Sequence, residues 1–243
     1  MTNSLRLQQL VKLIDITRLD DNDTPTAFND WVTALPKLTY AAYCVYPDFI
    51  SALLQHEGRS EQAQIATVVN FPSGDIATDI VCEQIQQAID LGATEIDCVL
   101  PYKTLMRGEH GAVTSFLYDV RQAATSCCLK IIIESGELIT AQQVAKATEL
   151  AIECGADFIK TSTGKVPFGV SEEAARIILT VIAAADREVG FKASGGVRSV
   201  EQAFQLIQLY EEITGKIATK ETMRIGASSL AEELNQQLEK ITD

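Results

Sequence analysis

Two lysines are the residues of this sequence whose positions point most directly to chemistry. Lys160 ends the apolar run of "ADFIKTSTGK", and Lys192 ends that of "VGFKASGG". Each run is typical of a short buried strand, and small or polar residues follow it at once. Removing an ammonium group from water costs free energy and favours its neutral form. Because a neutral lysine can attack a carbonyl carbon and form a Schiff base, the pair indicates an enzyme.

Asp97 is the candidate acid–base group. It ends "GATEID" (92–97), which repeats the pattern of "GADFIK" (155–160): a helix-ending Gly-Ala, an apolar rise, and a charged residue five positions after the glycine. Asp97 and Lys160 are therefore expected at the same depth, near the carboxyl ends of their strands and facing one another. Beside a Schiff-base lysine, this carboxylate could move protons through water while a carbon–carbon bond breaks or forms.

Other charged residues lie near the ends of predicted strands, namely Asp15, Lys130 and Glu134. They could join the same network. They are secondary candidates, because charged residues at a barrel rim often only satisfy one another.

Three segments resemble parts of an anion site: "TSTGK" (161–165), "SGGVR" (194–198) and "GASS" (226–229). Each follows a predicted strand, and the last leads into a predicted helix. Glycine lets backbone N–H groups approach a phosphate closely, and a helix N-terminus adds a favourable dipole. We therefore expect a small phosphorylated substrate.

The elements that must position these residues are short apolar runs alternating with amphipathic stretches. The predicted strands are residues 12–16, 41–46, 65–70, 94–100, 128–134, 157–161, 188–192 and 223–227. Eight strands alternating with helices over 243 residues predict one (β/α)₈ TIM barrel in a single domain, residues 1–243, with a short N-terminal helical extension. Active sites of such barrels lie at the carboxyl ends of the strands. A doubly wound open sheet is the alternative, but no GxGxxG follows the first strand.

The predicted helices carry recognisable patterns and boundaries. Residues 75–91 place four isoleucines on one expected stripe: Ile76, Ile80, Ile85 and Ile89. Further along, Thr140 and Gln143 form a capping-box pattern, Gly92 and Gly155 are expected to end helices, and Ser171 to begin one.

Composition narrows the classes of function. The net charge of −13 disfavours nucleic-acid binding, which needs a basic surface. The N-terminus lacks the continuous apolar region of a secretory signal, and the longest nearly apolar stretch, 177–185, is too short to span a membrane. Six scattered cysteines without a CxxC pair are expected to be reduced, in a cytoplasmic protein. The two histidines have no neighbours at metal-ligand spacing, so we expect no metal site.

Nearly the whole sequence resembles the deoxyribose-phosphate aldolases, which are class I (Schiff-base) aldolases. The similarity runs from "LIDITRLD" through "VVNFPSG", "EIDCVLPY" and "IIIESGEL" to "RIGASSL", and "DFIKTSTGK" followed by "GFKASGGVR" is its most specific part. The resemblance implies a TIM barrel that reversibly cleaves 2-deoxy-D-ribose 5-phosphate into D-glyceraldehyde 3-phosphate and acetaldehyde. It implies a sugar phosphate and aldehydes as the partners, and neither a metal nor an organic cofactor.

The resemblance also assigns residues. Lys160 would form the imine, Lys192 would keep Lys160 neutral enough to react, and Asp97 would act with water as the acid–base group. The phosphate would lie near Gly164, Lys165, Gly195, Gly196, Arg198, Gly226, Ser228 and Ser229. Further positions match the pocket without a defined role: Asp15, Thr17, Cys44 and Thr163.

Three alternatives remain open from the sequence. A sugar-phosphate isomerase could use the same barrel with a carboxylate base, a zinc-dependent aldolase would require metal, and a binding or regulatory barrel would bind sugar phosphate without converting it. Assembly is not determined either, although a homodimer is favoured. In some family members a C-terminal tail ending in tyrosine aids proton transfer; this sequence ends in "NQQLEKITD", so that contribution is expected to be absent or supplied otherwise.

Overall fold

A computed structural model describes residues 3–242 and contains a closed barrel of eight parallel strands. Each strand pairs with the next along the chain, and β8 pairs with β1, so the sheet has no free edge. The strands are β1 (Ile14–Arg18), β2 (Ala42–Val45), β3 (Gln64–Val69), β4 (Glu95–Val99), β5 (Cys128–Ile132), β6 (Phe158–Lys160), β7 (Gly190–Ala193) and β8 (Met223–Ala227).

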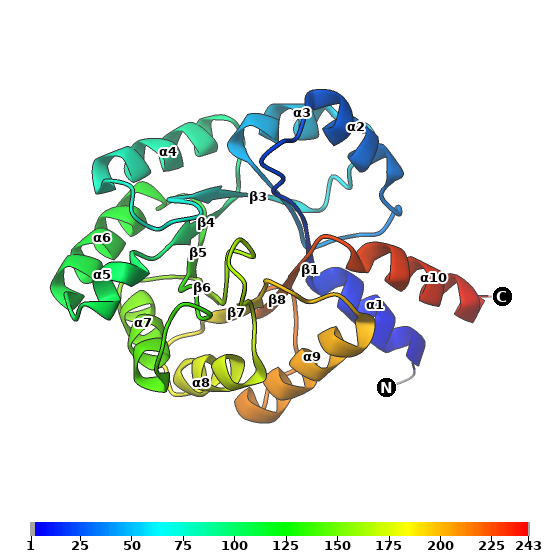
Figure 1. Ribbon diagram of the computed structural model, residues 1–243. Helices are drawn as coiled ribbons and strands as arrows, with labels where there is room; N and C mark the ends of the chain where they lie inside the picture. The colour runs from blue at the N-terminus through cyan, green and yellow to red at the C-terminus, as the bar shows by residue number, and fades with distance from the viewer. Residues whose placement is uncertain (1–2, 243) are drawn as a thin grey trace.

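Helices form a ring outside the strands (Figure 1). They are α1 (Asn3–Leu13), α2 (Pro25–Ala34), a 3₁₀ turn η1 (Pro47–Phe49), α3 (Ile50–Gln55), α4 (Thr78–Asp90), α5 (Tyr102–Met106), α6 (His110–Ala123), α7 (Ala141–Glu153), α8 (Glu172–Ala183), α9 (Val200–Thr214) and α10 (Leu230–Thr242). The first and last helices, α1 and α10, lie side by side (Figure 1). No helix within residues 3–242 is both long and apolar enough to cross a membrane.

The predicted (β/α)₈ architecture is confirmed, as is the helical extension, which is α1. All eight predicted strands form, with boundaries shifted by a few residues. The largest shifts at a strand start are two residues, at β1 and at β7. Strand β1 begins at Ile14 because Lys12 still belongs to the last turn of α1.

The predicted helix boundaries also hold. Thr140 and Gln143 form the expected capping box, with each side chain bonded to the backbone of the other residue. Ser171 caps α8 by accepting a hydrogen bond from the N–H of Ala174. Gly92 and Gly155 follow α4 and α7 with positive φ values of 104° and 93°, a conformation that glycine adopts at little cost.

The isoleucine stripe expected on residues 75–91 is wrong in part. The buried positions of α4 are Val81, Ile85 and Ala88, at spacings of four and three. Ile80, in contrast, is 48% exposed. The helix begins at Thr78, so Ile76 lies before it. The step of five from Ile80 to Ile85 exceeds the 3.6-residue turn, and it rotates the two residues away from a common face.

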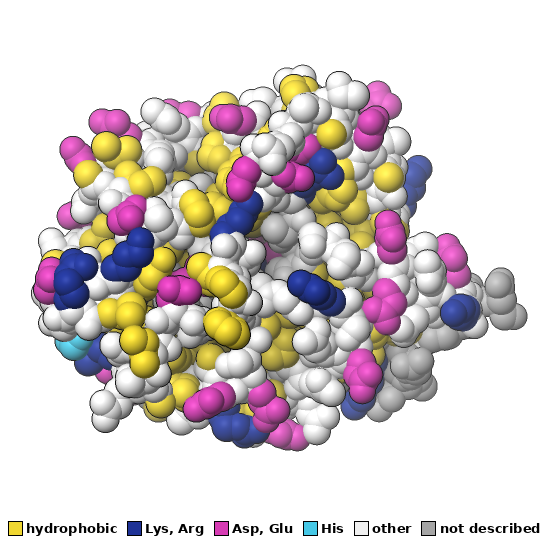
Figure 2. Space-filling model, in the orientation of Figure 1, with side chains coloured by type: hydrophobic (Ala, Val, Ile, Leu, Met, Phe, Trp, Pro, Cys, Tyr) yellow, Lys and Arg dark blue, Asp and Glu magenta, His cyan; other side chains and the backbone are white. Residues whose placement is uncertain are grey.

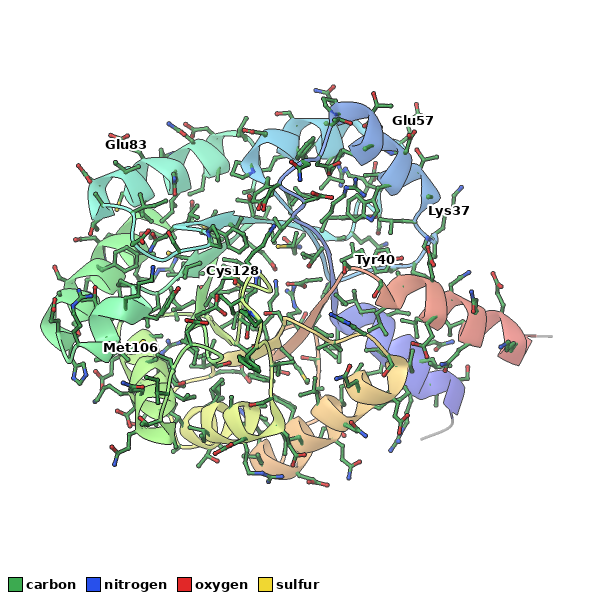
Figure 3. The ribbon with its side chains drawn as sticks, in the orientation of Figure 1. Lys37, Tyr40, Glu57, Glu83, Met106 and Cys128 are labelled. Carbon is green, nitrogen blue, oxygen red and sulfur yellow. The ribbon has the colours of Figure 1, made fainter. Side chains whose placement is uncertain are left out.

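The apolar core and the barrel interior are chemically different regions. The larger apolar cluster joins the strands to the helices, and its members include Ile96 of β4 and Ile131 of β5 together with buried residues of α4 and α6. Within the barrel, β2 and β3 contribute a small separate cluster: Ala42, Cys44, Ala66 and Val68. The other strands contribute charged side chains that are almost completely buried. Figure 3 shows side chains filling the ring, whereas Glu83 on α4 points away from it. Because burying charged groups costs free energy, these side chains in the barrel interior indicate a functional role.

Candidate active site

Seven charged side chains form one ion-pair network inside the barrel. Their spacing along the strands explains this, because residues two apart on a strand point to the same face. Glu95 and Asp97 are such a pair on β4, and the remaining members come one each from β1, β5, β6, β7 and β8: Asp15, Lys130, Lys160, Lys192 and Arg224.

Asp97 lies at the centre of the lysines. Lys160 and Lys192 both donate to its Oδ2 atom, each with an Nζ–Oδ2 distance of 2.7 Å, and Lys130 donates to Oδ1 at 2.8 Å. The thiol of Cys44 lies 3.9 Å from Oδ2. The structure thus brings Asp97 and Lys160 face to face, as their sequence pattern predicted, although β5 separates their strands.

A second layer of contacts lies behind this carboxylate. Asp15 forms ion pairs with Lys192 at 2.6 Å and with Arg224 at 2.7 Å. Glu95 forms ion pairs with Lys130 at 2.5 Å and with Arg224 at 2.8 Å. Because Arg224 bridges the two carboxylates, the network continues without interruption from the middle of the barrel to Asp97.

The network keeps most of its members charged. Burial alone would raise the pKa of Asp97, but the three lysines more than offset it and hold that pKa well below its usual range. The pKa of Asp15 is lowered in the same way, by Lys192, Arg224 and Lys130 against the effect of burial.

For Lys192 the sequence-based expectation of a lowered pKa is wrong. Burial does lower the pKa of this lysine, but the carboxylates of Asp15 and Asp97 outweigh burial and raise it. The same balance raises the pKa of Lys130. The physical reason is that the sequence pattern reveals burial but not the ion-pair partners, which come from other strands. Lys192 is therefore a fixed cation.

Charge balance distinguishes Lys160 from the other bases. The network holds four cations and three carboxylates, so one base is in excess. Among the residues that the structure describes, Lys160 has a single carboxylate partner, whereas Lys192 and Arg224 each have two. Lys160 is therefore the cationic residue of the network with the fewest ion-pair partners.

A cavity of about 280 Å³ opens directly onto Lys160. It has fifteen lining residues, and eleven of them are predicted site residues: Thr17, Lys160, Thr163, Gly164, Lys165, Gly195, Gly196, Arg198, Gly226, Ser228 and Ser229. Lys and Arg side chains lie near the middle of the face in Figure 2, which has the orientation of Figure 1. A larger groove of about 440 Å³ lies between α8 and α9 on the outside, but none of the ion-pair network lines it. We therefore take the smaller cavity as the candidate active site.

The remaining predicted residues lie beneath the cavity. Lys192, Asp97, Asp15 and Cys44 are fully buried and do not line it. Lys160 is thus the one member of the ion-pair network that also lines the cavity, within the described residues.

Glycine is required where the loops meet. Gly195 and Gly196 have φ values of 80° and 105°. A Cβ atom on Gly226 would lie 3.0 Å from the Cβ of Ser194 and 3.4 Å from the Cε of Lys192. The glycine therefore lets β8 pass close to the lysine. The 226–229 segment leads into the N-terminus of α10, as predicted for an anion site.

Glu134, a secondary candidate in the sequence, supports the 161–165 loop. It is buried, has a φ of 51°, and accepts hydrogen bonds from the backbone N–H of Thr163 at 3.2 Å and from its hydroxyl at 2.5 Å. The N–H of Lys165 then donates to the Thr163 hydroxyl at 3.0 Å. Burial raises the pKa of Glu134. These hydrogen bonds hold the 161–165 loop, which follows Lys160 and contributes to the candidate anion site.

Sequence reasoning missed two members of the network and part of the rim. Glu95 and Arg224 were not considered, and their signal was available, because each lies two residues before an inward-facing site residue on its own strand. Lys130 was ranked low, yet it bonds directly to Asp97. Leu19 also lines the cavity and was not predicted, because its apolar side chain gave no signal. The other rim residues, Ser194, Val197 and Ala227, lie within the predicted segments 194–198 and 226–229.

This chain is similar to known proteins over most of its length. The sequence model described as DeoC/LacD family aldolase matches residues 10–230. A crystal structure from Coccidioides immitis, described as a candidate deoxyribose-phosphate aldolase, is 28% identical, with 95% of this chain and 86% of that chain covered and a TM-score of 0.85. A structure described as "QR15, an Aldolase" is 27% identical, with 96% and 99% coverage and a TM-score of 0.81.

The barrel also resembles a more distant structure, described as a tetrameric deoxyribose phosphate aldolase from Aeropyrum pernix. The identity is 21%, the coverage is 100% of this chain and 99% of that chain, and the TM-score is 0.75. At this identity the likeness concerns the fold alone.

Proposed function

Since this chain belongs to the DeoC/LacD family of aldolases, and is therefore a carbon–carbon lyase, we propose that it cleaves 2-deoxy-D-ribose 5-phosphate. The products are D-glyceraldehyde 3-phosphate and acetaldehyde, and the reaction is reversible. The observation that carries the proposal is the position of Lys160, which lines the cavity while its Nζ atom lies 2.7 Å from Asp97 Oδ2.

Lys160 is the proposed nucleophile. It reacts as the neutral amine, and its position on the cavity wall places it within reach of a bound carbonyl group. The amine attacks the C1 carbonyl of the open-chain sugar phosphate, and loss of water gives the imine. Lys192 remains protonated beside it and disfavours a second positive charge on Lys160.

Asp97 is the proposed acid–base group in the cleavage step. Through a water molecule it accepts the proton of the C3 hydroxyl, while the electron pair of the C2–C3 bond moves into the imine. Glyceraldehyde 3-phosphate leaves. The resulting enamine is protonated at carbon, and water then hydrolyses the imine to release acetaldehyde and regenerate Lys160. Since the imine takes up the electron pair, this chemistry needs no further electron sink.

The substrate phosphate is proposed to bind at the Gly-rich end of the same cavity. The side chains available there are Lys165, Arg198, Ser228 and Ser229, together with the backbone N–H groups around Gly195 and Gly196. Holding the phosphate orients C1 toward Lys160, so that binding energy from a remote group supports the reacting centre.

Borohydride trapping tests the proposal. In the presence of substrate, borohydride is expected to reduce the imine and attach substrate carbon covalently to Lys160, as located by peptide mass spectrometry. Lys160→Met should gain no mass, and Lys165→Met, which keeps the nucleophile, should still be labelled. Robust turnover without labelling of Lys160 would exclude the imine and favour an isomerase or a metal-dependent route.

The domain organisation, location, pathway and oligomeric state of the protein are also proposals. We propose that residues 1–243 act as one domain, in the cytoplasm, in the breakdown of deoxyribonucleosides, and that the protein forms a homodimer. The six cysteines are free, which fits a reducing compartment. Light scattering of the purified protein would distinguish a dimer from the tetramer described for the Aeropyrum pernix protein.

A further inference from the structure

Asp21 binds one of the cations of the proposed phosphate site. It belongs to the loop between β1 and α2, and its Oδ1 atom accepts from the Nζ of Lys165 at 2.8 Å. The hydroxyl of Tyr46, just after β2, donates to the same oxygen at 2.5 Å. The Nζ of Lys165 also lies 5.9 Å from the centre of the Tyr46 ring. Segments that follow β1, β2 and β6 thus meet at one carboxylate.

The two cations at this end of the cavity are in different states. Lys165 is engaged by Asp21, whereas Arg198 makes no ion pair within residues 3–242. The side chain of Asp21 is 68% exposed and that of Lys165 is 24% exposed, so the carboxylate lies outside the cavity and the lysine lies at its rim. Hydrogen bonds from Lys165 and Tyr46 lower the pKa of Asp21.

We propose that Asp21 competes with the substrate phosphate for Lys165. In the free enzyme the Asp21 carboxylate is paired with the Lys165 ammonium group, to which a phosphate would otherwise bind. An entering phosphate, with a charge near −2, must replace this contact, and the contact re-forms when a phosphorylated substrate or product leaves. Asp21 therefore weakens phosphate binding and eases release, without touching the reacting carbons. The inference rests on the phosphate site of the proposed function.

The test is the dissociation constant of inorganic phosphate, measured by calorimetry on the intact protein. Asp21→Asn removes the competing charge and is expected to tighten phosphate binding about two- to fivefold, the range of an exposed ion pair. Asp20→Asn is the matched control, because it removes the same charge from the adjacent residue. The Asp20 carboxylate bonds to the N–H of Asn22 and not to Lys165, so the control should change phosphate binding much less.

A double variant shows whether the effect runs through Lys165. In a Lys165→Met background, Asp21→Asn is expected to have no further effect on phosphate binding. In otherwise normal enzyme, Asp21→Asn should lower the KM for the phosphorylated substrate and leave turnover of unphosphorylated deoxyribose unchanged.

The outcomes separate the two proposals. A wild-type protein that binds no phosphate contradicts the phosphate site itself, and with it the proposed substrate. A wild-type protein that binds phosphate overturns only the competition if Asp21→Asn binds no more tightly, if Asp20→Asn has an equal effect, or if the effect persists without Lys165.

Discussion

Lys160 and Lys192 donate to the same oxygen atom, Oδ2 of Asp97, each at 2.7 Å. The two amino groups therefore share one acceptor atom, but their other surroundings differ. Lys192 also bonds to Asp15 at 2.6 Å, while Lys160 has no second carboxylate among the described residues. The shared oxygen therefore assigns unequal roles to two residues of the same type.

This inequality predicts different stabilities for matched variants. Lys192→Met removes a fully buried cation that pairs with two carboxylates, and we expect it to lower the free energy of unfolding by about 3–5 kcal/mol. Lys160→Met leaves three cations and three carboxylates, so we expect a change of at most about 1 kcal/mol. Denaturant unfolding of both variants is the measurement. Equal destabilisation would contradict the charge balance inferred here.

Substitutions of Asp97 and Glu95 are expected to affect different properties, namely the rate of catalysis and the stability of the fold. Both lie on β4 and both bond to Lys130, but only Asp97 contacts Lys160. Asp97→Asn is expected to lower kcat by about 10²–10⁴-fold, the usual contribution of acid–base catalysis. Glu95→Gln should reduce thermal stability but lower kcat less than tenfold. Steady-state kinetics with circular dichroism checks both. If Glu95→Gln abolished turnover, acid–base catalysis would depend on the whole ion-pair network rather than on Asp97 itself.

The buried ion pairs predict a stability plateau across the neutral range. For Asp15 and Asp97 the folded-state pKa is lowered, so their stabilisation is complete above the unfolded value near 3.8 and is lost as the pH falls below it. For Lys130 and Lys192 the pKa is raised, so their stabilisation is complete below the unfolded value of 10.5 and is lost at higher pH. Between pH 3.8 and pH 10.5, the titration of these four groups should therefore change the melting temperature little. In Asp97→Asn the decline at low pH should be shallower.

Arg198 is expected to act on phosphorylated ligands only. It lines the cavity and has no ion-pair partner within residues 3–242, so its guanidinium is available to a phosphate. Arg198→Gln should raise the KM for the phosphorylated substrate about 10- to 100-fold, the value of a charge-assisted hydrogen bond. Turnover of unphosphorylated deoxyribose should not change. Arg176→Gln, on the surface of α8 and paired with Glu172, is the control and should leave both parameters unaltered.

Glu134 is predicted to hold the 161–165 loop in place. Glu134→Ala leaves the buried N–H and hydroxyl of Thr163 without their acceptor, at an expected cost of about 1–3 kcal/mol in unfolding free energy. Because Lys165 follows this turn, the KM for the phosphorylated substrate should also rise. Glu134→Gln keeps a carbonyl acceptor and should lose less on both measures. If the alanine and glutamine variants behaved alike, the hydrogen bonds to Thr163 would not be the cause.

Local patterns were sufficient for most of the fold. Apolar runs of strand length and the capping residues Thr140 and Ser171 depend on neighbours a few residues away, so the sequence reveals them directly. The stripe through Ile80 failed because a helix face must follow the 3.6-residue turn, and only the observed burial shows which face packs inward.

The candidate site was likewise predicted in part from the sequence, and the rest of it depends on the tertiary structure. The parallel patterns of 92–97 and 155–160 predicted that Asp97 and Lys160 would meet, and the family resemblance identified the loops that line the cavity. In the pairing of strands, however, Asp97 is level with Lys130, and Lys160 is level with Ile132, two residues further along. The tilt and stagger of the strands in a closed barrel bring the two side chains together, and those quantities belong to the whole sheet.

The sequence by itself therefore determined the elements, their order, and the facing pair of Lys160 and Asp97. Only the tertiary structure decided which charges neutralise which. The pairs of Arg224 with Asp15, of Lys192 with Asp15, and of Lys165 with Asp21 join residues more than 140 positions apart. Such pairs exist because barrel closure places distant strands and loops side by side. Since a pKa depends on the charges within a few ångströms, the protonation of Lys192 and the engagement of Lys165 could not be read from the chain alone.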